Sequence, residues 1–143
     1  MFGLNPIIAL LSFSNFGSSR FSQADKVSKA VKYLHKVLPN LNVDGPIQSD
    51  FALNNEMLAE RFPFSALNKR KVNTLIFPNL DAANITYKII KELDNTLSIG
   101  PILIGLKHPA HILQLGASVD EIVNMSAIAV IDAQEKQKIK YSK

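Results

Sequence analysis

Three short, continuous apolar runs constrain the fold of this chain more than any other feature of its sequence. They read PIIALLSF at residues 6–13, VNTLIFP at residues 72–78 and IGPILIGL at residues 99–106. Apolar runs of this length, without polar alternation, are typical of strands buried on both faces. We therefore predict three buried strands, and a further short strand at residues 41–48 that is broken at Asp44-Gly45-Pro46.

Segments with the helical period separate these runs. Helices are expected at residues 22–38, 53–62, 80–97 and 119–134. The apolar positions that share a face are Val27, Val31, Leu34 and Leu38 in one helix and Ala82, Ile85, Ile89 and Leu93 in another. Ser22, with Asp25 in the capping-box position, is expected to cap the first of these helices, and Asp81 the second.

Alternating strands and helices imply parallel pairing with right-handed crossovers. The predicted fold class is therefore α/β, with a mainly parallel sheet between helices on both faces, in three layers. The helix at residues 119–134 departs from the usual pattern, because its apolar residues cover nearly its whole circumference. Either it lies deep in this domain or a partner surface covers it, and the small size of the chain favours the partner.

Composition excludes several functions. The chain has no cysteine, and its net charge of +4 lies mostly in the tail QEKQKIKYSK at residues 134–143. We assign residues 1–134 to the folded domain and residues 135–143 to a basic, disordered tail. Nucleic-acid binding is not expected, and neither is a membrane partner, because the first apolar run is too short to span a bilayer. A cytoplasmic protein is expected.

The loop SNFGSSR at residues 14–20 is the first candidate site. Loops at the carboxyl ends of strands are where open α/β sheets bind ligands. Its candidate ligand-binding residues are Ser14, Asn15, Gly17, Ser18, Ser19 and Arg20. Asp25 argues against an anion in this loop. Its negative charge already interacts with the positive end of the following helix and would repel a second anion there. Composition alone leaves a ligand loop and a plain turn equally open.

The histidines suggest no metal site. His108 and His111 flank a Pro-Ala pair, but no acidic residue or cysteine lies close in sequence to complete a ligand set. His35 is expected on the solvated side of a lysine-rich helix. We predict no metal and no catalytic residue in this chain.

Four segments together carry a family resemblance across residues 6–134. They are LLSFSNFGSSR, VDGPIQSD, IFPNLDAANITYKIIKEL and IGPILIGLKHPAHILQLGASVDEIV. In order and spacing they resemble the carboxyl-terminal part of the phosphate acetyl/butyryltransferase family. The residues of the motifs most resemble those of the transacetylase-like domains of bacterial NADP-dependent malic enzymes. The resemblance implies part of an isocitrate/isopropylmalate dehydrogenase-like fold, a preceding domain of the parent chain, a homo-oligomer, and acetyl-CoA or a related acyl-CoA as ligand.

The resemblance also locates a second candidate site. Transferases of this family carry a Ser-Arg pair after the PILxGL strand and an acidic residue in the next helix. Here Gln114 and Leu115 stand in place of that pair, and Glu121 falls at or beside the acidic position. Acyl transfer to phosphate needs positive charge for the phosphate and the developing oxyanion, which Leu115 does not offer. We therefore predict no useful transacetylase activity, with Gln114 and Glu121 as ligand-binding residues.

Three functional hypotheses follow. The first is a non-catalytic, acetyl-CoA-sensing regulatory and oligomerisation domain of an NADP-dependent malic enzyme. Its parent would decarboxylate malate to pyruvate with NADP and a divalent metal, and no cofactor would bind in this piece. The second is an active phosphate acetyl/butyryltransferase with an unusual site. The third is an oligomerisation piece that binds no ligand.

Overall fold

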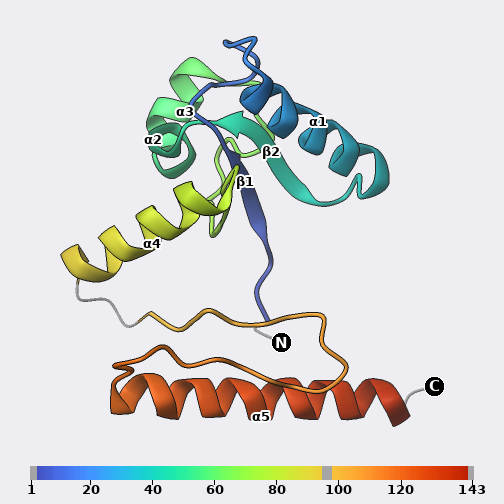
Figure 1. Cartoon of the computed structure of the whole chain (residues 1–143). Coiled ribbons are helices and arrows are strands. Elements are labelled where there is room, and N and C mark those ends of the chain that lie inside the picture. Colours follow the sequence, from blue (N-terminus) through green and yellow to red (C-terminus); the bar gives the residue numbers. More distant parts are fainter. Residues whose placement is uncertain (1–2, 95–97, 142–143) are drawn as a thin grey trace. The chain divides into compact units, whose positions relative to one another are not determined.

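The computed structural model describes residues 3–94 and 98–141 (Figure 1). The chain forms two compact units. We call Leu4–Tyr87 the sheet unit, and Lys88–Lys143 with Met1–Gly3 the second unit. The elements are β1 (Ile7–Leu11), α1 (Ser22–Val37), β2 (Asn42–Ile47), α2 (Ser49–Leu53), α3 (Asn55–Arg61), β3 (Thr74–Ile76), α4 (Leu80–Asp94) and α5 (Val119–Tyr141). The boundary between the two units falls within α4.

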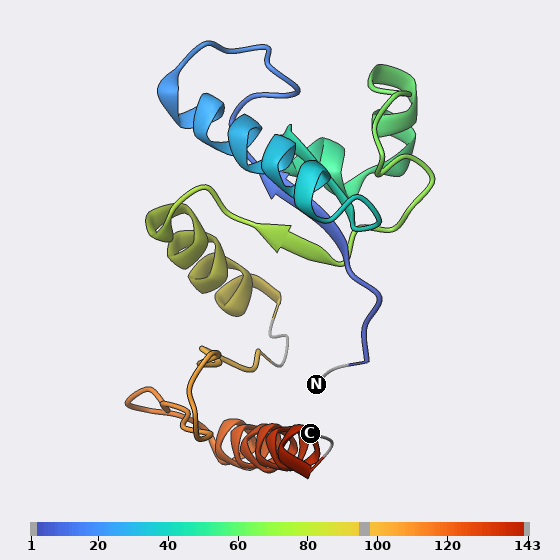
Figure 2. The same cartoon turned by 90° about the vertical axis from the view of Figure 1, so that its right-hand side faces the viewer.

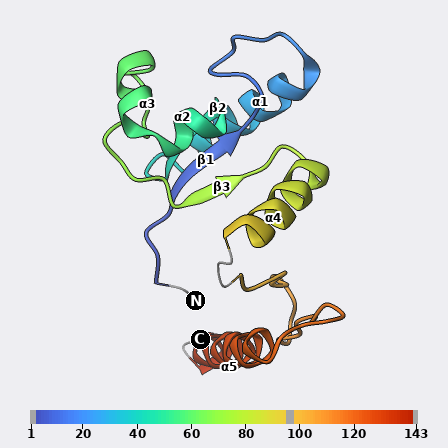
Figure 3. The same ribbon diagram turned by 90° about the vertical axis from the view of Figure 1, so that its left-hand side faces the viewer.

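The sheet unit is a three-layer parallel α/β structure. Its strands lie in the order β2-β1-β3, and both pairings are parallel. Side chains of β1 alternate between two cores: Leu10 packs with residues of α1, whereas Ala9 and Leu11 pack with residues of α2 and α3. Helices therefore cover opposite faces of the strands, as Figures 2 and 3 show. The predicted parallel sheet with helices on both faces is confirmed, whereas the dehydrogenase-like assignment stays a prediction.

Strand β2 differs from its prediction, because it runs through Asp44-Gly45-Pro46 without a break. The register with β1 shifts between Ala9 and Leu11, which pair with Asp44 and Ile47, so β2 holds one extra residue there. Such a bulge absorbs the residue that would otherwise interrupt the ladder. The strand survives a Gly-Pro pair for this reason.

The strand predicted at residues 99–106 is absent from the described structure, which has no regular element at those positions. Apolarity favours burial, but a strand also needs a neighbour for its backbone hydrogen bonds. The segment contains Pro101, which has no N–H to donate, and Ile104 is 83% exposed. The same pattern of residues therefore gives a strand at β1 and an irregular segment here.

Two predicted helix caps are wrong. Phe21 occupies the N-cap position of α1 without a side-chain hydrogen bond, so Ser22 is already inside the helix. At α4 the side chain of Asn79, not Asp81, accepts the Ala82 amide hydrogen at 2.8 Å. The predicted helix at residues 53–62 is confirmed as α3, where Asn54 accepts from two backbone amides.

Apolar side chains remain exposed on α4 and α5. Leu80, Ile85, Ile89 and Leu93 of α4 are more than half exposed, although the last three belong to the stripe that the helical pattern predicts to face a core. On α5, Met125 and Ile128 are buried, whereas Val119 and Val123 are exposed. The chain itself thus covers only part of the apolar circumference of α5.

Helix α5 continues through Tyr141, so residues 135–141, expected as a disordered tail, are helical. Lys136 pairs with Asp132 at 2.8 Å and Lys138 with Glu135 at 3.5 Å, which adds support at i,i+4 and i,i+3 spacing. No helix among the described residues is long and apolar enough for a membrane span.

Candidate functional site

The topological switch point of the sheet unit lies at the carboxyl ends of β1 and β3, because the strand order is β2-β1-β3. Strand β1 is followed by α1 on one face, and β2 is followed by α2 and α3 on the other. Open α/β sheets bind ligands where successive connections diverge to opposite faces. The predicted ligand loop at residues 14–20 follows β1 and therefore lies at this position.

Two carboxamide side chains tie this loop to the end of β2. Asn15 Nδ2 donates to Gln48 Oε1 at 2.8 Å, and the Gln48 amide donates to Asn15 Oδ1 at 2.7 Å. Gln48 Nε2 also donates to the Phe13 carbonyl at 2.7 Å, and the Phe16 amide donates to the Pro46 carbonyl at 2.7 Å. We call this set of bonds the Asn15–Gln48 clasp. The side chain of Asn15, a candidate ligand-binding residue, is therefore hydrogen-bonded within the chain through both its nitrogen and its oxygen.

The serines of the loop fall into two groups. Ser14 is buried, with its hydroxyl 2.9 Å from that of Ser18, and Ser18 Oγ also accepts the Asn15 amide hydrogen at 3.1 Å. Ser19 Oγ accepts the Phe21 amide hydrogen at 3.4 Å. Gly17 and Arg20 are exposed. The hydroxyls of Ser14 and Ser18 thus shape the turn, and Arg20 presents its charge to solvent.

A buried carboxylate anchors the neighbouring segment. Asp44 on β2 accepts from Ser65 Oγ at 2.9 Å, from the Ala66 amide at 2.8 Å and from the Gly45 amide at 2.9 Å. A buried charge is tolerated when hydrogen bonds satisfy it in this way. The segment after α3 is therefore fixed against β2.

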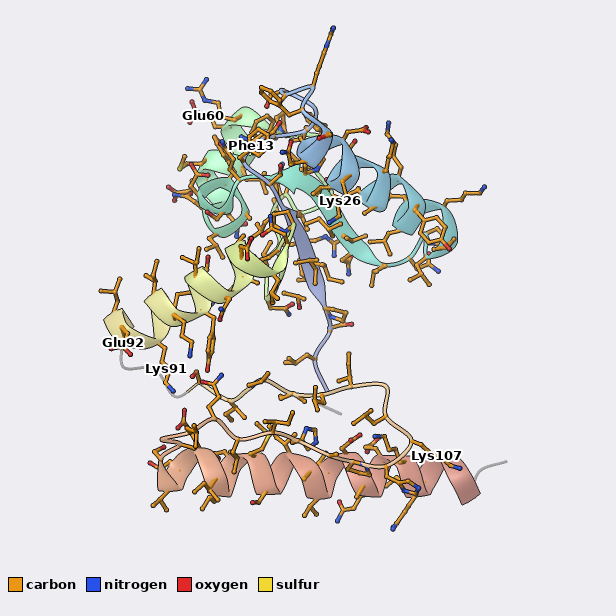
Figure 4. The ribbon with its side chains drawn as sticks, viewed as in Figure 1. Phe13, Lys26, Glu60, Lys91, Glu92 and Lys107 are labelled. Atoms are coloured by element: carbon orange, nitrogen blue, oxygen red, sulfur yellow. The ribbon has the colours of Figure 1, made fainter. Side chains whose placement is uncertain are left out.

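Aromatic rings join these two segments, and the sequence analysis missed them. The ring centroid of Phe16, in the β1–α1 loop, lies 4.9 Å from the ring centroid of Phe62 and 5.0 Å from that of Phe64. Figure 4 shows Phe13 of that loop and Glu60 of α3 at the same end of the sheet unit. The only sequence signal is the closely spaced pair of aromatic residues in FPF at residues 62–64.

The second candidate site lies in the second unit. Lys88 Nζ donates to Gln114 Oε1 at 3.1 Å, and Lys91 of α4 (Figure 4) pairs with Glu121 at 2.6 Å. The side chain of Leu115 is fully exposed. Gln114 and Glu121 are therefore both held by lysines of α4. Residues 14–20 belong to the other unit, the sheet unit.

Glu121 also closes a capping box at the start of α5. Ser118 Oγ accepts the Glu121 amide hydrogen at 3.2 Å, and Glu121 Oε2 accepts the Ser118 amide hydrogen at 2.8 Å. The segment SVDE at residues 118–121 carries this signal, which the sequence analysis overlooked. A helix-capping role thus accounts for the carboxylate of Glu121.

Glu121→Gln is expected to weaken the C-terminal helix in a pH-dependent way. Hydrogen bonds from Lys91 and from the Ser118 amide lower the pKa of Glu121 below its ordinary value of 4.5. The ionised group therefore stabilises the fold above pH 4.5, and this stabilisation is lost as pH falls through the lowered pKa. Urea midpoints at pH 7 and pH 3 should show a deficit for the variant at pH 7 that shrinks at pH 3.

The matched control is Glu92→Gln on α4, whose side chain is exposed (Figure 4). It measures the effect of removing one carboxylate without removing the capping box. A deficit for Glu121→Gln that is equal at both pH values would contradict the assignment.

The histidines occupy three different environments. The side chain of His111 is buried beside α5, with Nε2 3.9 Å from Asp132 Oδ2, and neither ring nitrogen has a hydrogen bond within the described part of the chain. His108 is exposed. His35 is exposed, but its Nε2 lies 2.8 Å from the Val43 carbonyl, so it is not simply solvated as predicted. Among the residues described, no group of three or more His, Cys, Asp or Glu side chains could hold a metal.

The sheet, its switch point and the loop after β1 define an open, parallel α/β protein. Within that class, the chain belongs to the phosphate acetyl/butaryl transferase family, whose model matches residues 1–130. The family resemblance seen in the sequence is therefore confirmed.

Relatives of two kinds resemble the chain to similar degrees. It is 41% identical over 135 residues to the NADP-dependent malic enzyme of Haemophilus influenzae, covering 94% of this chain and 18% of that protein. It is 39% identical over 131 residues to the phosphate acetyltransferase of Clostridium acetobutylicum, covering 92% of this chain and 39% of that protein. Among solved structures, a phosphotransacetylase from Streptococcus pyogenes superposes with a TM-score of 0.83 at 39% identity, covering 92% of this chain and 40% of that one. The chain thus spans less than half the length of each of these relatives.

Proposed function

We propose that this chain is the acetyl-CoA-sensing, non-catalytic domain of an NADP-dependent malic enzyme. The observation that carries the proposal is Leu115, an apolar and fully exposed side chain at the position where the transferase motif has arginine. Removing one group that stabilises a developing oxyanion costs about 100-fold or more in rate. Such a site binds an acyl-CoA without transferring its acyl group.

The neighbours of Leu115 support this role. Gln114 accepts a hydrogen bond from Lys88, and the carboxylate of Glu121 is shared between Lys91 and the Ser118 amide. Both side chains thus hold the loop to α4 and α5. In this proposal an acyl-CoA that contacts the loop changes how these two helices pack, which is regulation if two packings differ in affinity.

The parent protein follows from the same proposal. It is a longer chain that decarboxylates malate with NADP and a divalent metal, both bound outside these residues. The exposed apolar residues of α4 and α5 would be covered by the preceding domain and by a second subunit. The length of the malic enzyme relatives supports this arrangement, because the chain covers 18% of the one from Haemophilus influenzae. A cytoplasmic location is part of the proposal.

One observation favours the alternative, an active phosphate acetyl/butyryltransferase. The Lys88 ammonium, 3.1 Å from Gln114 Oε1, places a positive charge next to the position of the missing arginine. In the alternative Lys88 supplies the charge that Leu115 lacks. The identity to phosphate acetyltransferases, 39% for that of Clostridium acetobutylicum, is equally compatible with it.

An acyl-transfer assay separates the two functions. The chain is mixed with acetyl phosphate and CoA, thioester formation is followed by absorbance, and acetyl-CoA binding is measured separately by titration calorimetry. We expect binding without turnover above background. Turnover that falls at least about 100-fold in both Gln114→Ala and Lys88→Ala would establish the transferase instead. An absence of binding heat together with an absence of turnover would leave the oligomerisation role.

A further inference from the structure

The side chain of His111 is a buried ionisable group that the proposed function does not use. It is 2% exposed, and neither of its ring nitrogens has a hydrogen bond within the described residues. Buried polar atoms of folded proteins nearly always have such a partner. The charged groups around His111 indicate what that partner is.

His111 lies beside the covered face of α5, within the second unit. The segment that carries it runs along the helix (Figure 1). Met125 and Ile128 are the buried residues of α5, and Asp132 follows Ile128 by one turn on the same face. Asp132 Oδ2 lies 3.9 Å from His111 Nε2, which is about 1 Å longer than a charge-assisted hydrogen bond. The two groups are therefore near enough to pair after a small movement.

Asp132 already has one cationic partner. Lys136 Nζ lies 2.8 Å from Asp132 Oδ2, and the Lys136 side chain is 30% exposed. A carboxylate accepts more than one hydrogen bond, because its two oxygens offer about four lone-pair sites. Asp132 can therefore accept from His111 while Lys136 stays or turns towards solvent.

The other charged groups near this contact are exposed or already paired. Those of the histidine segment and of the same part of α5 are Lys107, His108, Glu135 and Lys138. The pair between Lys91 of α4 and Glu121 lies at the start of α5, eleven residues before Asp132 and so about 16 Å away along the helix. Asp132 is thus the carboxylate that faces His111.

The charge of the imidazole decides whether the contact forms. A neutral imidazole has one donor nitrogen, whereas the protonated ring donates from both nitrogens and carries a positive charge. A buried cation without a partner is strongly unfavourable, and a carboxylate next to it removes most of that cost. Histidine is the side chain that ordinarily changes charge between pH 5 and pH 8. Protonation therefore favours closing the gap to Asp132.

We infer that His111 and Asp132 form a proton-dependent latch, which fastens the segment carrying Gln114 to α5 when His111 is protonated. Gln114 lies three residues after His111, and the capping box of Ser118 and Glu121 already holds the far end of the same segment. The latch thus fixes the near end at acid pH and releases it as the pH rises. The inference needs no ligand and does not depend on the proposed function.

The test follows the ring C–H signals of the histidines by NMR in the whole chain, from pH 5 to pH 8.5. The chain has three histidines, so glutamine variants of each assign the signals. Asp132→Asn is expected to lower the midpoint pH of the His111 signal by about 0.5–1 pH unit, a loss of about three- to tenfold in proton affinity. Lys136→Gln should raise the midpoint, because it removes a competing cation. The backbone amide signal of Gln114 should change with the same midpoint as His111.

Glu135→Gln is the matched control. It makes the same change from carboxylate to amide on the same helix, at a residue that pairs with Lys138 at 3.5 Å. The His111 midpoint in this variant should equal that of the unmodified chain.

Three results would overturn the latch. The first is a His111 midpoint that is the same in Asp132→Asn as in the unmodified chain. The second is a His111 signal that does not change across the pH range, and the third is a Gln114 amide signal that stays constant while His111 titrates. If Asp132→Asn does not fold, Lys136→Gln decides, since it keeps both partners: a midpoint that does not rise overturns the latch. None of these measurements contains an acyl-CoA, so the latch and the proposed function fail separately.

Discussion

Replacing Gly45 with alanine is expected to destabilise the sheet unit by roughly 2–6 kcal/mol, the sum of backbone strain and overpacking. Gly45 has a φ of 144°, which side chains rarely adopt. A Cβ atom there would lie 2.5 Å from the carbonyl oxygen of Leu10, a backbone atom of the central strand. Because neither backbone can withdraw without disturbing the β1–β2 ladder, the strain cannot be relieved locally.

Gly17→Ala provides the comparison for this prediction. Gly17 also has a positive φ, 88°, but a Cβ atom would meet nothing within 4 Å. Its cost is therefore that of the left-handed conformation alone, about 1–2 kcal/mol. Urea unfolding followed by circular dichroism measures both variants against the unmodified chain. Equal losses of stability in Gly45→Ala and Gly17→Ala would contradict the prediction, because the close approach to Leu10 would then add nothing to the cost.

Leu58→Ala is expected to cost about 2–5 kcal/mol, the range for removing a fully buried leucine side chain. Leu58 on α3 is completely buried and belongs to the core that includes Ile47 and Leu67. Alanine suits a helix, so the loss comes from the removed contacts and the cavity, not from helix propensity.

Leu53→Ala on the neighbouring helix α2 makes the same chemical change at a residue that is 63% exposed. Its expected effect is within about 0.5 kcal/mol. The difference in urea midpoint between the two variants measures burial directly. A loss at Leu53 as large as that at Leu58 would mean that Leu53 is covered in solution, for example by a second copy of the chain.

Local patterns predict most of the regular elements. The periodicity of apolar residues located α1 and α4, and short apolar runs located β1 and β3, because these patterns mark residues that favour burial. The run at residues 99–106 has the same composition and forms no strand, because pairing depends on a neighbour that the run itself does not encode. The caps failed for a related reason: Asn79 and Asp81 are both acceptable caps, and only the backbone geometry selects Asn79.

The candidate site was predicted less completely than the fold. The sequence predicts a strand followed by a loop at residues 14–20, and this loop does follow β1 in the structure. The roles of its residues depend on partners that are remote in sequence: Asn15 bonds Gln48, 33 positions away. The ring contacts of Phe16 with Phe62 and Phe64 are equally remote. Such contacts form only when β1 and β2 pair, so no local sequence pattern predicts them.

The Asn15–Gln48 clasp has a kinetic consequence. A loop that two side chains already hold to the end of β2 does not have to become ordered when a ligand arrives. Encounter with such a site is then limited by diffusion and orientation, without a slower closing step. The lifetime of a complex formed there would be set by how quickly the ligand leaves, and the loop would not act as a gate.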